Sequence, residues 1–128
     1  MTRILVADDS SQVRRVLRSL VEQDSDWKVC AEAIDGGDAV QRAAETNPDL
    51  IVIDFQMPVM NGLEAAREIT KVSPNVPILL CTAHLTPNLV SEARRVGING
   101  AVSKSRATDI VNGIRALLRH ESFFCQPA

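Results

Sequence analysis

The stretch that decides the fold is Leu50–Gly62, which reads LIVIDFQMPVMNG. It opens with a short, wholly apolar run, which is typical of a strand buried on both faces of a sheet. Asp54 follows at once and ends the apolar run. A loop over 55–61 then leads to a helix predicted from Gly62 to about Val72. The stretch therefore predicts a buried strand that presents an acid at the end of a sheet.

The same alternation of strand and helix extends to both sides of this stretch. Further strands are predicted over 4–7, 29–33, 78–81 and 101–104. The helices between them are predicted after a cap at Ser10 or Ser11, from Gly36 to before Pro48, from Pro87 to Val96, and over the apolar stripe at 110–118. In the first helix, the arginines at 14, 15 and 18 are expected on the solvent face. Five such units predict an α/β fold, a five-stranded parallel sheet with helices on both faces.

Length and charge narrow the class of protein. A chain of 128 residues predicts one domain, expected over 1–119, with 120–128 as a C-terminal tail or the start of a linker. The net charge of −2 argues against direct nucleic-acid binding by this domain, because such binding depends on a basic surface.

The cysteines and apolar runs indicate the compartment. Cys30, Cys81 and Cys125 show no metal-ligand spacing and are expected to be free thiols in a reducing cytosol. The N-terminal sequence reaches acidic residues too early for a signal peptide, and no apolar run is long enough to span a bilayer. We therefore predict a cytoplasmic protein without membrane contacts.

Reactive polar residues stand at the ends of four predicted strands. Asp8 and Asp9 follow the first strand, Asp54 the third, Thr82 the fourth, and Lys104 ends the fifth. The carboxyl ends of parallel strands meet at one edge of the sheet, where ligands of such folds bind. We expect these five side chains to converge there.

The expected cluster predicts a phosphoryl-transfer site that uses Mg²⁺. Three neighbouring carboxylates repel one another unless a cation lies between them, and all-oxygen ligands suit Mg²⁺. Lys104 and Thr82 supply an ammonium and a hydroxyl for phosphoryl oxygens. The reaction indicated is attack by the Asp54 carboxylate to give an acyl phosphate.

Each residue of the cluster also has a simpler interpretation. Asp8 and Asp9 could merely cap the first helix. Thr82 could satisfy backbone groups at a strand end, and Lys104 could be a solvated surface residue. The functional interpretation rests on the coincidence of all five at strand ends.

The sequence resembles the receiver domains of two-component response regulators over residues 3 to about 118. The resemblance is carried by ILVADD at 4–9, the Asp-x-x-Met-Pro-x-Met-x-Gly run at 54–62, Thr82-Ala83 and Lys104. It implies a flavodoxin-like sheet in the order 2-1-3-4-5. The Lys104-Ser105 pair and the stretch 117–124 resemble the NarL-like branch, in which a linker and a helix-turn-helix domain follow the receiver.

The resemblance also implies roles and partners. Asp54 would accept a phosphoryl group from a histidine kinase or phosphotransfer protein. Asp9, Asp54 and the backbone carbonyl of Gln56 would bind Mg²⁺ directly, Asp8 would bind it through water, and Thr82 and Lys104 would hold the phosphoryl group. Relatives use the fourth helix, fifth strand and fifth helix to contact an effector domain or a second copy.

The sequence departs from the family pattern at two positions. Ala101 stands where relatives carry an aromatic side chain that moves inward after phosphorylation, and Ser105 stands where many have proline. The usual coupling between Thr82 and an aromatic is therefore in doubt. The residues Phe123 and Phe124 are expected either to lead into a linker or to pack against the last helix.

Three other functions are weighed against this one. A phosphatase that forms an aspartyl phosphate would need a second acid where Gln56 stands. A receiver-like interaction module that is never phosphorylated would typically lack an acid or the lysine. Nucleotide or flavin binding has no Gly-rich phosphate loop after the first strand. We expect a phosphoacceptor switch that assists its own phosphorylation and dephosphorylation, not an enzyme.

Overall fold

The computed structural model describes residues 1–126, which form one six-stranded parallel sheet in the order β2-β1-β3-β4-β5-β6. The strands are β1 (Thr2–Ala7), β2 (Trp27–Ala33), β3 (Leu50–Ile53), β4 (Ile78–Thr82), β5 (Gly100–Ser103) and β6 (Phe123–Phe124). The helices are α1 (Ser11–Glu22), α2 (Gly36–Thr46), α3 (Gly62–Val72), α4 (Pro87–Arg95) and α5 (Ala107–Leu118).

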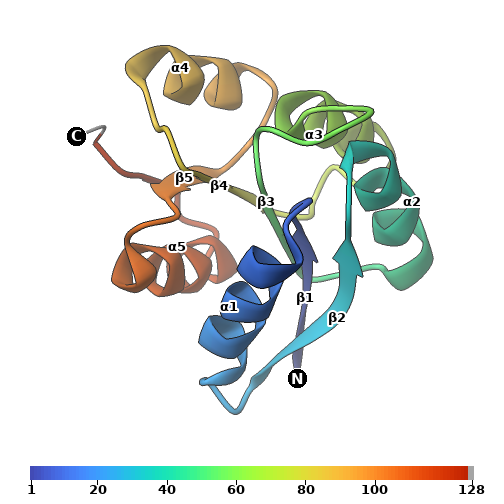
Figure 1. Ribbon diagram of the computed structural model, residues 1–128, viewed down its shortest axis with the longest axis vertical. Coiled ribbons are helices and arrows are strands. Elements are labelled where there is room, and N and C mark those ends of the chain that lie inside the picture. The colour runs from blue at the N-terminus through green and yellow to red at the C-terminus, as the bar shows by residue number, and fades with distance from the viewer. Residues whose placement is uncertain (127–128) are drawn as a thin grey trace.

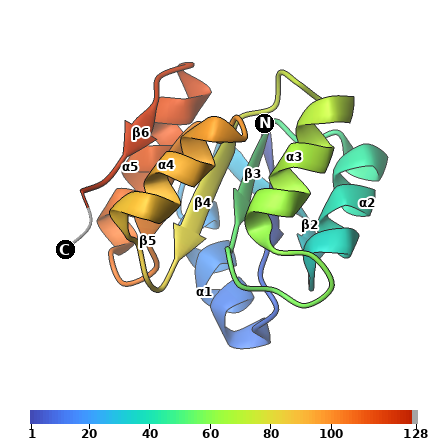
Figure 2. The ribbon, with the colours of Figure 1, turned by 90° about the horizontal axis from the view of Figure 1, so that it is seen from above.

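The helices cover the two faces of the sheet unequally. Figure 1 shows α1 and α5 together below the sheet, and α2, α3 and α4 above it. Figure 2, the view from above, shows the latter three side by side. Each face has its own apolar core, with Leu17, Ile110 and Ile114 on the α1 and α5 side and Ala39, Ala65 and Leu89 on the other. The predicted α/β fold is confirmed.

Side-chain caps fix where four of the helices begin. The Ser10 hydroxyl accepts from the backbone N–H of Val13 at 3.2 Å, so the cap of α1 is Ser10 rather than Ser11. Asn61 and Glu64 form a reciprocal capping box at the start of α3. Asp35 and Thr86 cap α2 and α4 as Ser10 caps α1, each side chain accepting from the backbone N–H three residues on.

The sheet has one strand more than the sequence predicted. The extra strand, β6, pairs with the outer edge of β5, where the Phe123 N–H donates to the Asn99 carbonyl at 3.1 Å and the Cys125 N–H to the Ala101 carbonyl at 2.9 Å. Because side chains alternate along a strand, Phe123 packs into the core beside α5 and Phe124 into the core beside α4.

The edge of the sheet is shaped to receive this short strand. A Cβ atom on Gly100 would lie 2.6 Å from the carbonyl oxygen of Phe123, so only glycine admits the strand at this distance. The Phe124 ring lies beneath the Arg94 guanidinium, whose central carbon is 3.9 Å from the ring centroid. Phe124 also pairs in register with Ala101, the position where the resemblance leads one to expect an aromatic. The two phenylalanines therefore pack within the fold.

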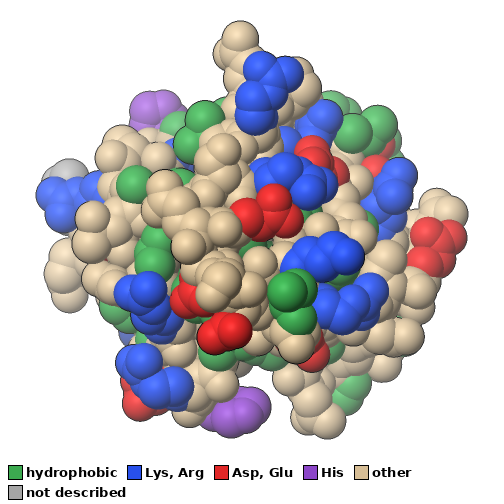
Figure 3. All heavy atoms as spheres, turned by 90° about the horizontal axis from the view of Figure 1, so that it is seen from below, with side chains coloured by type: hydrophobic (Ala, Val, Ile, Leu, Met, Phe, Trp, Pro, Cys, Tyr) green, Lys and Arg blue, Asp and Glu red, His purple; other side chains and the backbone are tan. Residues whose placement is uncertain are grey.

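None of the helices within residues 1–126 combines the length and the apolar character that a bilayer span needs. Figure 3 shows acidic and basic side chains intermixed on the face opposite to that of Figure 2.

Candidate functional site

The five residues predicted to converge do lie together at the carboxyl edge of the sheet. One carboxylate oxygen from each of Asp8, Asp9 and Asp54 lies within 4.8 Å of the other two. The Lys104 Nζ lies 2.7 Å from the Asp8 Oδ2 and 3.1 Å from the Asp54 Oδ2. Thr82 ends β4 and lines the same pocket as Asp9, Asp54 and Lys104.

The pocket combines a buried floor with an open mouth. Its volume is about 580 Å³, and Gln56 and His84 also line it. Of the residues that line it, Asp54 and Thr82 are buried, with 5% and 4% of their surfaces exposed, whereas Asp9 is exposed. Asp8, which pairs with Lys104, is buried as well, at 1%. A small anion or cation therefore has access to a carboxylate that is otherwise shielded from water.

The charges in this pocket act on one another. Burial raises the pKa of the Asp54 carboxyl above its ordinary value; Lys104 opposes this rise, and the negative charge of Asp8 adds to it. Burial also disfavours the Lys104 ammonium, but the two carboxylates beside it outweigh that effect and raise its pKa. The cluster is thus short of positive charge, with three acids facing one lysine.

The residues present fit a hard divalent cation. The Asp8 Oδ2 is buried and lacks a well-directed hydrogen bond, so its contact with Lys104 is an ion pair that leaves lone-pair capacity free. The cluster offers oxygen atoms only, which Mg²⁺ prefers over the softer ligands that zinc favours. Gln56 lies in the loop beside them, on the wall of the pocket.

The loop after β3 holds Asp54 by backbone contacts. The Asp54 N–H donates to the Ala7 carbonyl at 2.9 Å, which extends the pairing of β3 with β1, and the Gly62 N–H returns to the Phe55 carbonyl at 2.8 Å. A Cβ on Gly62 would lie 2.1 Å from the Asp54 carbonyl oxygen. The glycine that ends the 54–62 run is therefore required for α3 to begin against the backbone of Asp54.

The helix-capping interpretation of Asp8 and Asp9 does not hold. Ser10 caps α1, and the Asp8 Oδ1 accepts from the Ser10 N–H at 2.9 Å, one step before the helix. The other Asp8 oxygen faces Lys104. Both acids are thereby left to the cluster rather than to the helix end.

The contact of Arg14 with the site was not predicted from the sequence. Arg14 was expected on the solvent face of α1, and that prediction was wrong: its side chain is only 14% exposed. Its Nη1 donates to the Asp8 carbonyl at 2.7 Å and its Nε to the Glu32 carboxylate at 3.0 Å. The helical pattern gives no sign of this, because Glu32 belongs to β2 and the two meet only in the folded sheet.

Comparison with known proteins agrees with this architecture. The sequence matches the response regulator receiver domain family over residues 4–115. It is 37% identical over 123 residues to YxjL, a transcriptional regulatory protein of Bacillus subtilis, covering 95% of this chain and 56% of that protein. It is 33% identical over 116 residues to the chemotaxis protein CheY of Thermotoga maritima, covering 88% of this chain and 96% of CheY.

Solved structures give the same result. A LuxR-family two-component response regulator from Aurantimonas sp. SI85-9A1 superposes with a TM-score of 0.92 at 34% identity, covering 96% of this chain and 89% of that one. The receiver domain of NarL from Mycobacterium tuberculosis gives 0.86 at 28% identity, covering 92% and 96%. The chain spans just over half the length of YxjL. With this fold, this acidic pocket and these matches, the chain belongs to the receiver domain family of two-component response regulators.

Proposed function

We propose that Asp54 is the phosphoacceptor of this receiver domain, with a histidine kinase or phosphotransfer protein as the donor. The observation that carries the proposal is the position of Asp54 at the floor of the pocket, 3.1 Å from the Lys104 Nζ and within 4.8 Å of two further acids. Reactions of this kind depend on positioning and on charge stabilisation, both of which these contacts supply.

Each residue of the pocket has a role in this proposal. Asp9, Asp54 and the Gln56 backbone carbonyl would hold Mg²⁺ directly and Asp8 would hold it through water; when bound, the ion neutralises charge on the phosphoryl oxygens. An Asp54 carboxylate oxygen forms the bond to phosphorus while the bond between phosphorus and the donor breaks. Lys104 donates to one phosphoryl oxygen.

Thr82 and Gln56 have the two remaining roles, which concern binding of the phosphoryl group and its removal by water. The Thr82 hydroxyl donates to another phosphoryl oxygen. Gln56 has no acidic proton to give, which supports a phosphoacceptor that assists its own phosphorylation and dephosphorylation over a phosphatase.

The output of the switch is proposed from the relatives. Two of them are transcriptional regulatory proteins of which this chain covers 56% and 50%, so we propose that the receiver (1–119) controls an effector domain or a homodimer, with 120–128 as tail or linker. The contact surface would be α4, β5 and α5. The setting would be the cytoplasm, where such kinases present their phosphohistidine.

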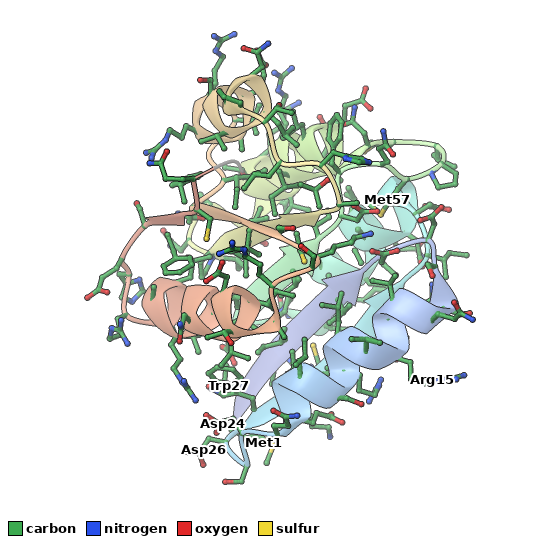
Figure 4. The ribbon with its side chains drawn as sticks, turned by 60° about the vertical axis from the view of Figure 1, so that its left-hand side comes forward. Met1, Arg15, Asp24, Asp26, Trp27 and Met57 are labelled. Atoms are coloured by element: carbon green, nitrogen blue, oxygen red, sulfur yellow. The ribbon has the colours of Figure 1, made fainter. Side chains whose placement is uncertain are left out.

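Phosphorylation with a small-molecule donor tests the acceptor. Wild-type protein, Asp54→Asn and Asp26→Asn are each incubated with acetyl phosphate and Mg²⁺, and intact mass is measured. Asp26 is the matched control, since it lies at the opposite end of the sheet from Met57 in the loop after β3 (Figure 4). We expect one phosphoryl adduct on wild type and Asp26→Asn and none on Asp54→Asn.

Two outcomes would contradict the proposal. Equal adduct on all three proteins would place the acceptor elsewhere. No adduct on wild type, together with failure to bind beryllofluoride, would indicate a receiver-like interaction module that acts without phosphorylation.

A further inference from the structure

Two ion pairs between α1 and β2 lead to a hydrogen bond with the backbone of the acidic cluster. The Arg18 Nη2 lies 2.7 Å from one oxygen of Glu32, and the Arg14 Nε lies 3.0 Å from the other. The Arg14 Nη1 then reaches the Asp8 backbone carbonyl at 2.7 Å. Arg14 thus connects a charged residue of the neighbouring strand to the backbone of the acidic loop.

The carbonyl that Arg14 contacts has a particular place in the site. It belongs to the peptide group that joins Asp8 to Asp9, and a peptide group is planar. The backbone torsions on either side of that plane, ψ of Asp8 and φ of Asp9, set how the two carboxylates are directed relative to each other, so a contact that holds the carbonyl constrains their relative orientation. On its other side, Asp8 is fixed by its own N–H, which donates to the Ala33 carbonyl at 3.1 Å.

Arg14 is itself held rigidly enough to orient this peptide. The guanidinium is planar, so a bond from Nε to Glu32 fixes the direction in which Nη1 points. Glu32 is anchored in turn, because it pairs in register with Val6 of β1 and bonds to Arg18 as well. A bond between two fixed groups constrains geometry, whereas one from a mobile surface side chain would not.

We propose that Arg14 is a positioning residue that orients the Asp8–Asp9 peptide and thereby sets the affinity of the acidic cluster for a divalent cation. The inference rests on the proposed function, in which these acids hold Mg²⁺. Groups that orient the direct ligands of a metal commonly change its affinity by about tenfold or more when they are removed.

The sign of the effect separates positioning from charge. Arg14 carries a positive charge close to the cation site, so by charge alone its removal would tighten cation binding. Positioning predicts the reverse, because the two carboxylates would lose their common orientation. A variant without the guanidinium therefore decides between the two explanations.

Cation binding is measured with Mn²⁺ as the probe, because the electron paramagnetic resonance signal of unbound Mn²⁺ is lost when the ion binds. Mg²⁺ then serves as the competitor. The variants are Arg14→Met, Arg14→Lys and Glu32→Gln, with Arg15→Met as the matched control. Figure 4 shows Arg15 pointing away from the sheet on the same helix. Circular dichroism establishes that each variant is folded.

We expect the dissociation constant of Mn²⁺ to rise about tenfold in Arg14→Met, less in Arg14→Lys and Glu32→Gln, and not at all in Arg15→Met. Lysine has a single nitrogen and cannot serve Glu32 and Asp8 together, while glutamine keeps one acceptor for Arg14. Saturating Mg²⁺ should restore the extent of phosphorylation by acetyl phosphate in Arg14→Met, because Arg14 does not touch the phosphoryl group in this proposal.

The outcomes that overturn the inference are distinct from those that overturn the proposed function. Unchanged or tighter Mn²⁺ binding in Arg14→Met refutes positioning, and if that variant does not fold, the same result in Arg14→Lys does so. A rise of equal size in Arg15→Met also refutes it. Absence of Mn²⁺ binding to wild type would instead refute the Mg²⁺ site itself.

Discussion

Asp54 is surrounded by neighbours that act on its charge in opposite directions. Burial and Asp8 raise its pKa, so the folded protein favours the protonated form more than the unfolded chain does. The stabilisation that comes from this preference for the protonated form is therefore fully present below the ordinary carboxyl pKa. It is lost as the pH rises through the higher pKa of Asp54 in the folded state. At neutral pH and without a divalent cation, the ionised Asp54 destabilises the fold.

We accordingly expect Asp54→Asn to increase the free energy of unfolding at pH 7 in the presence of a chelator. The increase should shrink as the pH falls towards the carboxyl range, because the wild-type side chain becomes neutral as well. Urea unfolding at several pH values measures both, with Asp26→Asn as control. A loss of stability in Asp54→Asn at pH 7 would show that the pairing with Lys104 outweighs burial.

Within residues 1–126, Lys104 is the one cationic side chain that pairs with the carboxylates of Asp8 and Asp54. Lys104→Met leaves two buried acids without it, so we expect a loss of about 3 kcal/mol in the free energy of unfolding at pH 7. The exposed Lys71 pairs with Glu68 on the surface of α3, and Lys71→Met should cost less than about 1 kcal/mol. Denaturant unfolding measures both losses. Equal losses would mean that the pairing of Lys104 with the buried acids stabilises the fold no more than an exposed ion pair does.

Single residues of the site differed in how far the sequence could predict them. Asp8, Asp54, Thr82 and Lys104 were predictable because each marks the end of a strand, and strand ends converge in a parallel sheet. Arg14 was not, since its contacts depend on which side of β2 Glu32 faces.

At the scale of elements, β6 depends on space left by residues far from it in the sequence. Gly100→Ala would place a Cβ 2.6 Å from the Phe123 carbonyl and 3.0 Å from the Leu117 side chain. We expect the strand to be displaced, with a loss of about 1–3 kcal/mol in the free energy of unfolding.

Limited chymotrypsin digestion tests this displacement, because the enzyme cleaves after exposed phenylalanine. Cleavage at Phe123 and Phe124 should become much faster in Gly100→Ala. Gly37→Ala serves as control, since its Cβ would meet only ordinary contacts at 3.4 Å and beyond. An unchanged digestion pattern would show that β6 tolerates the added methyl group.

The main elements were predictable, and β6 was not. The predicted strands and helices follow from apolar runs and stripes, and the start of α3 at Gly62 is confirmed. The order of the first five strands, which the resemblance to receiver domains implies, is confirmed as well. A strand of two residues, such as β6, is too short to show the alternation of apolar and polar residues by which strands are predicted. The fit of Phe123 against Gly100 and Gly113 appears only when β5 and α5 are in place. The boundary predicted at 119 stays a prediction.

For the molecule as a whole, cation binding should be linked to folding. If Mg²⁺ binds the folded protein alone, a free concentration of a hundred times the dissociation constant adds about 2.7 kcal/mol to the free energy of unfolding. We expect a chelator to reverse this, and Asp54→Asn to gain less. Thermal or urea unfolding with K⁺ at matched ionic strength provides the control; an equal gain with K⁺ would reduce the effect to screening.

The direction of β6 has a practical consequence. Since it runs parallel to β5, it carries the chain back towards the edge of the sheet where the acids lie, and Cys125 and Gln126 line a hollow of about 760 Å³ together with His84 and Ser105. A dye or a fused module attached after residue 126 would thus start beside the loops that leave β4 and β5. Because few residues separate this point from β6, the fluorescence of a dye attached there should respond to changes at the rim of the acceptor pocket rather than at the opposite end of the sheet.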